Sequence, residues 1–197
     1  MARQLIRAAT YRAQKTVRDI EGQIAAWRNR LRNRLGLPVF QYGNIVITGC
    51  PRSGTTILNL IFAYTMVDAV GWDFEMHATD PYIPRFSREA QRRGATVVTK
   101  HTEDWRHIDR IRWLLPGVRF VYVWRDPASN ICSKMKGQEE YTRGPKEYIA
   151  AYRAMKKQEG RPDFTIVKFR DLVTKPNDVQ ARLEHRVITS FMVPFSE

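Results

Sequence analysis

The sequence contains few cysteines, no long apolar run and comparatively few acidic residues. Only Cys50 and Cys132 are cysteines among its 197 residues, and no CxxC pair or Cys/His cluster occurs. A disulfide scaffold and a structural zinc site are therefore disfavoured, and a reducing, cytoplasmic environment is expected. No stretch reaches the roughly 18 consecutive apolar residues that a membrane-spanning helix needs. The N-terminus also lacks the apolar core and cleavage site of a secretory signal.

The scarcity of acidic residues leaves the chain strongly basic. It has 33 Lys and Arg against 20 Asp and Glu, a net charge of +13, and residues 1–36 carry nine basic residues against Asp19 and Glu21. A basic protein favours an anionic partner, which could be a nucleic acid, a membrane lipid, a nucleotide or an acidic substrate. No zinc finger, RNP motif or helix-turn-helix pattern is present, so a nucleic-acid partner is not expected.

Residues 1–36 are predicted to form one basic amphipathic helix. Apolar residues recur at spacings of three and four, at Val17, Ile20, Ile24, Trp27, Leu31 and Leu35. Gly36 and Pro38 then end the helix. Three roles remain open for it: packing on the domain or on a second copy in a homo-oligomer, lying on an anionic membrane surface, or acting as a targeting peptide.

Residues 37–197 are predicted to form a single α/β domain. Short β-branched runs alternate with helical patterns. We expect strands at 44–48, 95–99, 118–124 and 164–169, and helices at 55–70, 104–115 and 145–158, with others starting near 127 and 176. This alternation favours βαβ units and a central parallel sheet flanked by helices.

The segment GCPRSGTT, residues 49–56, lies directly after a predicted strand and before a predicted helix. Backbone N–H groups of such a loop, with the following helix N-terminus, can cradle a phosphate. The spacing matches a Walker A loop except that Thr55 occupies the position of the lysine, and Arg52 is the nearest cation. This change favours a compact anion bound without a metal. The alternative is a turn without a ligand.

A second candidate anion site follows the strand at 118–124, in WRDPASNICS. Arg125 leaves the carboxyl end of that strand, and Ser133 follows eight residues later. Ligands of open α/β sheets bind at this edge, so Arg125 should lie near the phosphate loop. Two anion sites on one edge indicate a nucleotide with phosphates at both ends of its ribose, whereas the simpler alternative is an ion pair between Arg125 and Asp126.

PRSGTT followed by RDPxxxxxS resembles the paired signatures of the sulfotransferases that use 3′-phosphoadenosine 5′-phosphosulfate (PAPS). VKFRDLVTKP, residues 167–176, is similar to a third segment of that family, and the resemblance spans about residues 44–176. It is nearer to bacterial and Golgi-type members, because Ile57 stands where cytosolic members have Trp. The resemblance implies a P-loop α/β fold and PAPS as donor. It places the 5′-phosphosulfate and the 3′-phosphate on two sets of residues: Arg52, Ser53, Gly54, Thr55 and Thr56 for the first, Arg125 and Ser133 for the second.

The resemblance also implies in-line transfer of a sulfuryl group to a hydroxyl or amine of a small-molecule, carbohydrate or lipid acceptor. Arg52 would stabilise the leaving phosphate, with Lys100 as a second cation, and no metal is expected. The general base is either Glu75 or His101, and we favour Glu75. His77 and Asp73 are further candidates.

Two other function classes remain open. One is an ATP-dependent small-molecule kinase, which the Thr at position 55 disfavours. The other is a degenerate, non-enzymatic module that binds membranes or nucleic acid. Many relatives have a Gly/Lys-rich C-terminal loop that closes over the 3′-phosphate, and this sequence shows none. Closure would then depend on Arg92 and Arg93, on the N-terminal helix or on a second subunit; the remaining alternative is that no lid exists and donor binding is weak.

Overall fold

The computed structural model describes residues 43–66, 69–71, 75–80, 83–133 and 144–187, with the single positions 24, 27, 31 and 35. Most of the predicted helix at 1–36, and the candidate Asp73, lie outside these residues. Three of the described positions in the range 1–36 are helical and exposed: Ile24, Trp27 and Leu31.

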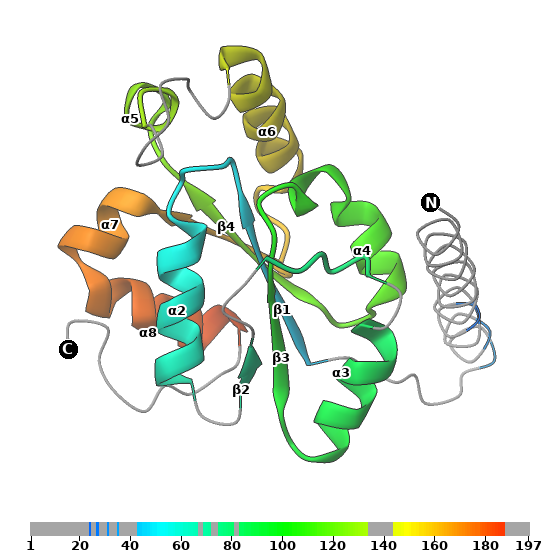
Figure 1. The fold of residues 1–197 in the computed structure, drawn as a ribbon. Helices are drawn as coiled ribbons and strands as arrows, with labels where there is room; N and C mark the ends of the chain where they lie inside the picture. The colour runs from blue at the N-terminus through cyan, green and yellow to red at the C-terminus, as the bar shows by residue number, and fades with distance from the viewer. Residues whose placement is uncertain are drawn as a thin grey trace, which may run out of the picture.

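A five-stranded sheet with every strand parallel to its neighbours forms the centre of the molecule (Figure 1). The strand order is β2-β3-β1-β4-β5. The strands are β1 (Asn44–Gly49), β2 (Ala69–Gly71), β3 (Thr96–Lys100), β4 (Arg119–Trp124) and β5 (Phe164–Lys168). Because β1 lies between β3 and β4, the chain crosses over β1 on its way from β3 to β4. Ligands of open parallel sheets bind at the carboxyl edge beside such a crossover.

Helices cover both faces of the sheet (Figure 1). They are α2 (Thr55–Thr65), α3 (Ile83–Arg92), α4 (Ile108–Leu114), α5 (Pro127–Ile131), α6 (Pro145–Gln158), α7 (Phe169–Thr174) and α8 (Pro176–Val187), with a short 3₁₀ helix, η1 (Asp104–Arg106). The predicted α/β class with a parallel, helix-flanked sheet is therefore confirmed. Among the described residues no helix combines the length and apolarity needed to cross a membrane.

The core has two layers, one on each face of the sheet. The first joins the sheet to α2, α7 and α8 through apolar side chains that include Leu58, Phe62, Leu172, Val179 and Leu183. The second joins it to α3, η1, α4 and α6, with side chains that include Ile83, Trp105, Ile111, Ala151 and Met155. Burial on both faces explains why β1 reads as a continuous apolar run rather than an alternating one.

Three elements differ from the sequence predictions. The helix predicted over 55–70 ends at Thr65, since Met66 is extended (φ −76°, ψ 137°), and β2 follows it. Helix α3 was not predicted, and Phe169, placed in a strand, begins α7. A three-residue edge strand has too little pattern to read. The apolar residues Ile83, Phe86 and Ala90 of α3 do recur at helical spacing, so an available signal for this helix was missed.

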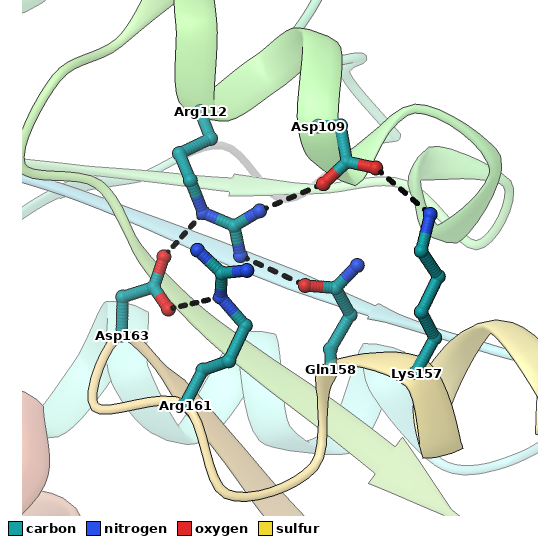
Figure 2. Close-up of polar contacts among 6 residues, drawn as sticks. All are labelled: Asp109, Arg112, Lys157, Gln158, Arg161 and Asp163. Atoms are coloured by element: carbon teal, nitrogen blue, oxygen red, sulfur yellow. Dashed lines mark hydrogen bonds and ion pairs between the residues drawn. The ribbon is translucent and has the colours of Figure 1, made fainter.

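A polar network joins α4 to the end of α6 and the turn before β5 (Figure 2). Arg112 is its centre: Nε donates to Asp163 at 2.5 Å, Nη1 to Asp109 at 2.9 Å and Nη2 to Gln158 at 3.0 Å. Lys157 adds a contact to Asp109 at 3.4 Å. Arg112 is only 21% exposed and Asp163 18%, so these charges are stabilised mainly by each other.

Candidate active site

The loop between β1 and α2 holds its backbone in a strained conformation. Arg52 has a φ of 69°, the one positive φ of a non-glycine residue in the described parts of the chain, and Gly54 has a φ of 101°. The N–H of Ser53 donates to the carbonyl of Cys50 at 3.1 Å, which closes the turn. Left-handed backbone at a non-glycine residue costs roughly 1–2 kcal/mol and clusters at ligand sites.

Gly49 ends β1 where the chain runs closest to β4. A Cβ at this position would lie 2.5 Å from the carbonyl oxygen of Val123 and 2.7 Å from Ser53 Oγ. Both distances are too short for carbon, so only glycine lets the loop leave β1 beside β4 without displacing backbone.

Three hydrogen bonds fasten the segment after β4 to this loop. Asn130 Nδ2 donates to the carbonyl of Pro51 at 3.1 Å, and Arg125 Nη1 donates to the carbonyl of Arg52 at 3.1 Å. Arg52 Nε in turn donates to Ser133 Oγ at 3.3 Å. The two motifs recognised in the sequence are thus one structural unit. Asn130 was missed by sequence reasoning, although its place inside the second motif was an available signal.

Arg125 is held by backbone contacts and not by the carboxylate beside it in sequence. Asp126 caps α5 instead, since it accepts the N–H of Ser129 at 2.8 Å, and this bond holds the pKa of Asp126 below its usual value. Tyr148 Oη donates to the carbonyl of Arg125 at 2.7 Å. The guanidinium is therefore available on the loop side, which weakens the simpler interpretation of Arg125 as a partner of Asp126.

A cavity of about 480 Å³ opens between these elements, a size typical of small-molecule sites. Its lining residues are Pro51, Arg52, Gly54, Thr55, Thr56, Ile57, Glu75, Thr102, Arg125 and Phe169. Six of the ten site residues predicted from the sequence are among them. The other four are Ser53, Lys100, His101 and Ser133, of which Ser53 is fully buried and Ser133 reaches the site through Arg52.

Phe169 forms one wall of this cavity, a position that sequence reasoning did not assign to it. Its ring lies 4.7 Å from the guanidinium carbon of Arg125. It also lies against Gly54, where a Cβ would come within 2.4 Å of Phe169 Cδ2. An aromatic residue following β5 therefore touches both predicted anion-binding segments.

Glu75 enters the cavity from a segment that runs beside the end of β3. The N–H of Met76 donates to the carbonyl of Lys100 at 2.9 Å, which aligns the two segments. Glu75 Oε1 accepts from Lys100 Nζ at 2.7 Å, and Glu75 Oε2 lies 3.7 Å from His101 Nε2. Lys100 is only 4% exposed, so its charge depends on this carboxylate.

The hydrogen bonds of His101 place the proton of its neutral imidazole on Nε2. His101 Nδ1 accepts the N–H of Glu103 at 3.1 Å, so Nδ1 carries no hydrogen. Burial lowers the pKa of His101 below its usual value, and the neighbouring His77 lowers it further. Because Nε2 then carries the proton, neither ring nitrogen can readily accept one from a substrate.

His77 has the opposite environment. Its Nδ1 lies 2.8 Å from Oδ1 of Asp104, a fully buried carboxylate whose Oδ2 accepts the N–H of Ala78 at 2.9 Å. The bond to Asp104 raises the pKa of His77 despite partial burial. The His77 and His101 rings stack with centroids 3.3 Å apart, so a charge on one disfavours a charge on the other.

His77, His101 and Asp104 come close enough to be considered as metal ligands, since one potential ligand atom from each lies within 4.8 Å of the others. The hydrogen bonds argue against that use. His101 Nδ1 and both Asp104 oxygens already accept hydrogen bonds. A metal bound to His101 Nε2 would place the ring proton on Nδ1, where the backbone N–H of Glu103 already points. The donor set fits a hydrogen-bonded network better than a metal site.

Arg92 and Arg93 do not lie where a lid requires them. Arg92 is the last residue of α3 and Arg93 follows it, so both precede the amino end of β3, and both pair with Glu89. The phosphate loop follows the carboxyl end of β1, which runs parallel to β3. The two arginines are therefore at the opposite edge of the sheet from the cavity, and the suggestion that they close over a nucleotide is wrong.

Comparisons with known proteins agree with this architecture. Two sulfotransferase domains of solved structure are similar to the chain. The domain from the olefin synthase of Synechococcus PCC 7002 has a TM-score of 0.56 at 15% identity, over 78% of this chain and 76% of that one. The domain from the curacin biosynthetic pathway has a TM-score of 0.52 at 16% identity, over 75% and 74%. At these identities the likeness shows the fold alone.

No curated protein sequence matches the chain. A family profile described as "Sulfotransferase family" matches residues 65–187, which is more than half of the chain. The loop at residues 49–56 lies before this range, so its predicted role as a phosphate loop rests on its own sequence and position. The matched range contains Arg125, Ser133 and Phe169, so it includes the second predicted anion-binding segment and the cavity wall. The chain belongs to the sulfotransferase family.

Proposed function

We propose that the protein transfers a sulfuryl group from PAPS to a hydroxyl or amine acceptor. The observation that carries the proposal is the single cavity lined by Arg52 of the phosphate loop, Arg125 of the second motif and the carboxylate of Glu75. Two cations and one potential base around one cavity suit a donor with two anionic groups and an acceptor that must lose a proton. Residues 37–197 form the catalytic domain in this proposal, and residues 1–36 a basic appendage.

The donor-binding role falls on the two fastened motifs. Arg52, Thr55, Thr56 and the amide of Gly54 would surround the 5′-phosphosulfate at the start of α2, while Arg125 would bind the 3′-phosphate and Ser133 would support it through Arg52. Buried Ser53 would shape the loop. In the transfer, a bond forms between the acceptor oxygen or nitrogen and sulfur as the bond from sulfur to the bridging oxygen breaks, and adenosine 3′,5′-bisphosphate leaves with its new charge near Arg52.

Glu75 is the better candidate for the general base. It lines the cavity, and Lys100 holds only one of its two carboxylate oxygens. His101 does not line the cavity and carries its proton on the nitrogen that faces Glu75. In this proposal Glu75 accepts the acceptor's proton, while Lys100 holds the carboxylate in place.

The acceptor is a small molecule, a carbohydrate or a lipid. The lining of the cavity that contains Glu75 also includes Thr102 and Ile57, one polar and one apolar side chain. Such a mixed lining suits an acceptor with a hydroxyl or amine on an apolar frame.

Calorimetric titration with adenosine 3′,5′-bisphosphate, in parallel with ATP and Mg²⁺, tests the donor. We expect micromolar binding of the bisphosphate, loss of that binding in Arg125→Ala, and no binding of ATP. Binding of ATP with Mg²⁺ alone would favour the kinase alternative. Binding of neither would overturn the enzyme proposal and favour a non-enzymatic module.

The base is tested by sulfuryl transfer with PAPS and a panel of phenol, sugar and amine acceptors. Glu75→Gln retains an oxygen for Lys100 and cannot take a proton, so it should lower kcat about 10²- to 10⁴-fold while donor binding persists. His101→Asn serves as the comparison and should retain more activity. A larger loss in His101→Asn than in Glu75→Gln would reverse the assignment.

A further inference from the structure

Phe169 contacts both the phosphate loop at Gly54 and the guanidinium of Arg125 while lining the cavity. It is the first residue of α7, placed directly after β5, and it is half-buried. Its position is fixed by the pairing of β5 with β4, in which Trp124 lies opposite Lys168. Arg125 and Phe169 thus follow the ends of neighbouring strands.

Arg125 depends on few other contacts for its orientation. Its Nη1 donates to the carbonyl of Arg52, and its Nε is buried with no hydrogen-bond partner among the described residues. No acidic side chain is paired with it in the described part of the chain. The face of an aromatic ring attracts a guanidinium through the ring quadrupole and leaves the edge of the cation open to a ligand.

We propose that Phe169 is a positioning residue that presents Arg125 to the second phosphate of the nucleotide, so that it sets the preference for a ribose carrying a 3′-phosphate. The inference rests on the proposed function, in which Arg125 binds that phosphate. The ring acts through Arg125. Any apolar side chain of similar size can pack against Gly54, whereas the attraction to the Arg125 guanidinium requires the face of an aromatic ring. The two contacts can therefore be separated by choice of substitution.

Two substitutions remove the aromatic face in different ways. Phe169→Leu keeps an apolar side chain beside Gly54. Replacement of Phe169 by pentafluorophenylalanine keeps the shape and packing of the ring but reverses its quadrupole. This variant tests the same contact if Phe169→Leu fails to fold. Phe169→Tyr keeps the aromatic face and should therefore keep the preference for the bisphosphate. Phe120→Leu is the matched control, because Phe120 also faces a guanidinium, that of Arg112 at 5.3 Å, and does not line the cavity.

The readout is the ratio of the dissociation constants of adenosine 5′-phosphate and adenosine 3′,5′-bisphosphate, measured by calorimetry. The wild type should favour the bisphosphate. In Phe169→Leu and in the pentafluoro variant this preference should fall about 10-fold, mainly through weaker bisphosphate binding. It should persist in Phe169→Tyr and in Phe120→Leu, whatever their stability.

A double substitution shows whether the ring acts through Arg125. In an Arg125→Ala background, titrated at nucleotide concentrations high enough to follow its weakened bisphosphate binding, Phe169→Leu should cause no further loss of preference. The proposal is overturned if the single variants leave the ratio unchanged, if they weaken both nucleotides equally, or if the loss is as large without Arg125. A wild type that does not prefer the bisphosphate would refute the proposed function itself, and this inference with it, before any variant is compared.

Discussion

Substitution of Gly54 by alanine should destabilise the protein through two separable effects. The first is backbone strain, because Gly54 has a φ of 101°. The second is overlap, because the new Cβ would lie 2.4 Å from Cδ2 and 2.8 Å from Cε2 of Phe169. The ring would have to move away from the loop and from Arg125.

The two effects have different sizes and can be measured apart. Left-handed backbone costs an alanine roughly 1–2 kcal/mol, and overpacking costs about 1–3 kcal/mol. Gly54→Ala should therefore lower the free energy of unfolding by about 2–5 kcal/mol. Gly160 is the matched control, since its φ is 84° and nothing lies within 4 Å of a Cβ built there. Gly160→Ala should show the strain alone.

Equilibrium urea unfolding, followed by tryptophan fluorescence, measures both variants. The double variant Gly54→Ala with Phe169→Ala should lose less stability than the sum of the single changes, because the smaller side chain removes the overlap. Equal losses in Gly54→Ala and Gly160→Ala, within about 0.5 kcal/mol, would refute the reasoning. Additive losses in the double variant would do the same.

Three further predictions concern the surrounding network. In His77→Asn the pKa of His101 should rise, because the positive charge of His77 is lost; burial still holds that pKa below its usual value. Proton NMR of the His101 imidazole as a function of pH measures the pKa, and an unchanged pKa would contradict the prediction. Asp163→Ala should cost about 1.5–3 kcal/mol in urea unfolding, whereas Glu89→Ala, which breaks only exposed ion pairs, should cost less than about 1 kcal/mol. Asn130→Ala should weaken binding of adenosine 3′,5′-bisphosphate, because it removes the hydrogen bond that joins the phosphate loop to α5. Calorimetry measures this affinity, and an unchanged value would contradict the prediction.

Much of the fold was predictable because its signals are local. The β-branched run at 44–48, the loop at 49–56 and the helix after it lie in one short stretch, and each is present in the structure, although the helix ends at Thr65 rather than at residue 70. The register of β4 and β5 brings their following residues to the same edge as this loop. That is why Arg125 could be assigned to the site from its place after a strand.

The contacts inside the site could not be read from the sequence. Glu75 and Lys100 are 25 positions apart, and Asn130 and Pro51 are 79 apart, so no helical or strand period relates them. The proton position on His101 depends on the backbone N–H of Glu103, which only the turn after β3 brings to it. Choosing between the two candidate bases required these distances.

The strand order also has a consequence for how the protein acquires its activity. The central strand β1 is synthesised before every strand that pairs with it, since Asn44 pairs with Val97 and Ile45 with Arg119. Contacts so distant along the chain form slowly, and β1 must remain unpaired until much of the domain has left the ribosome. The cavity wall at Phe169 arrives later still. The proposed nucleotide affinity should therefore appear only late in synthesis, which makes it a sensitive reporter of complete folding for variants whose substitutions lie away from the cavity.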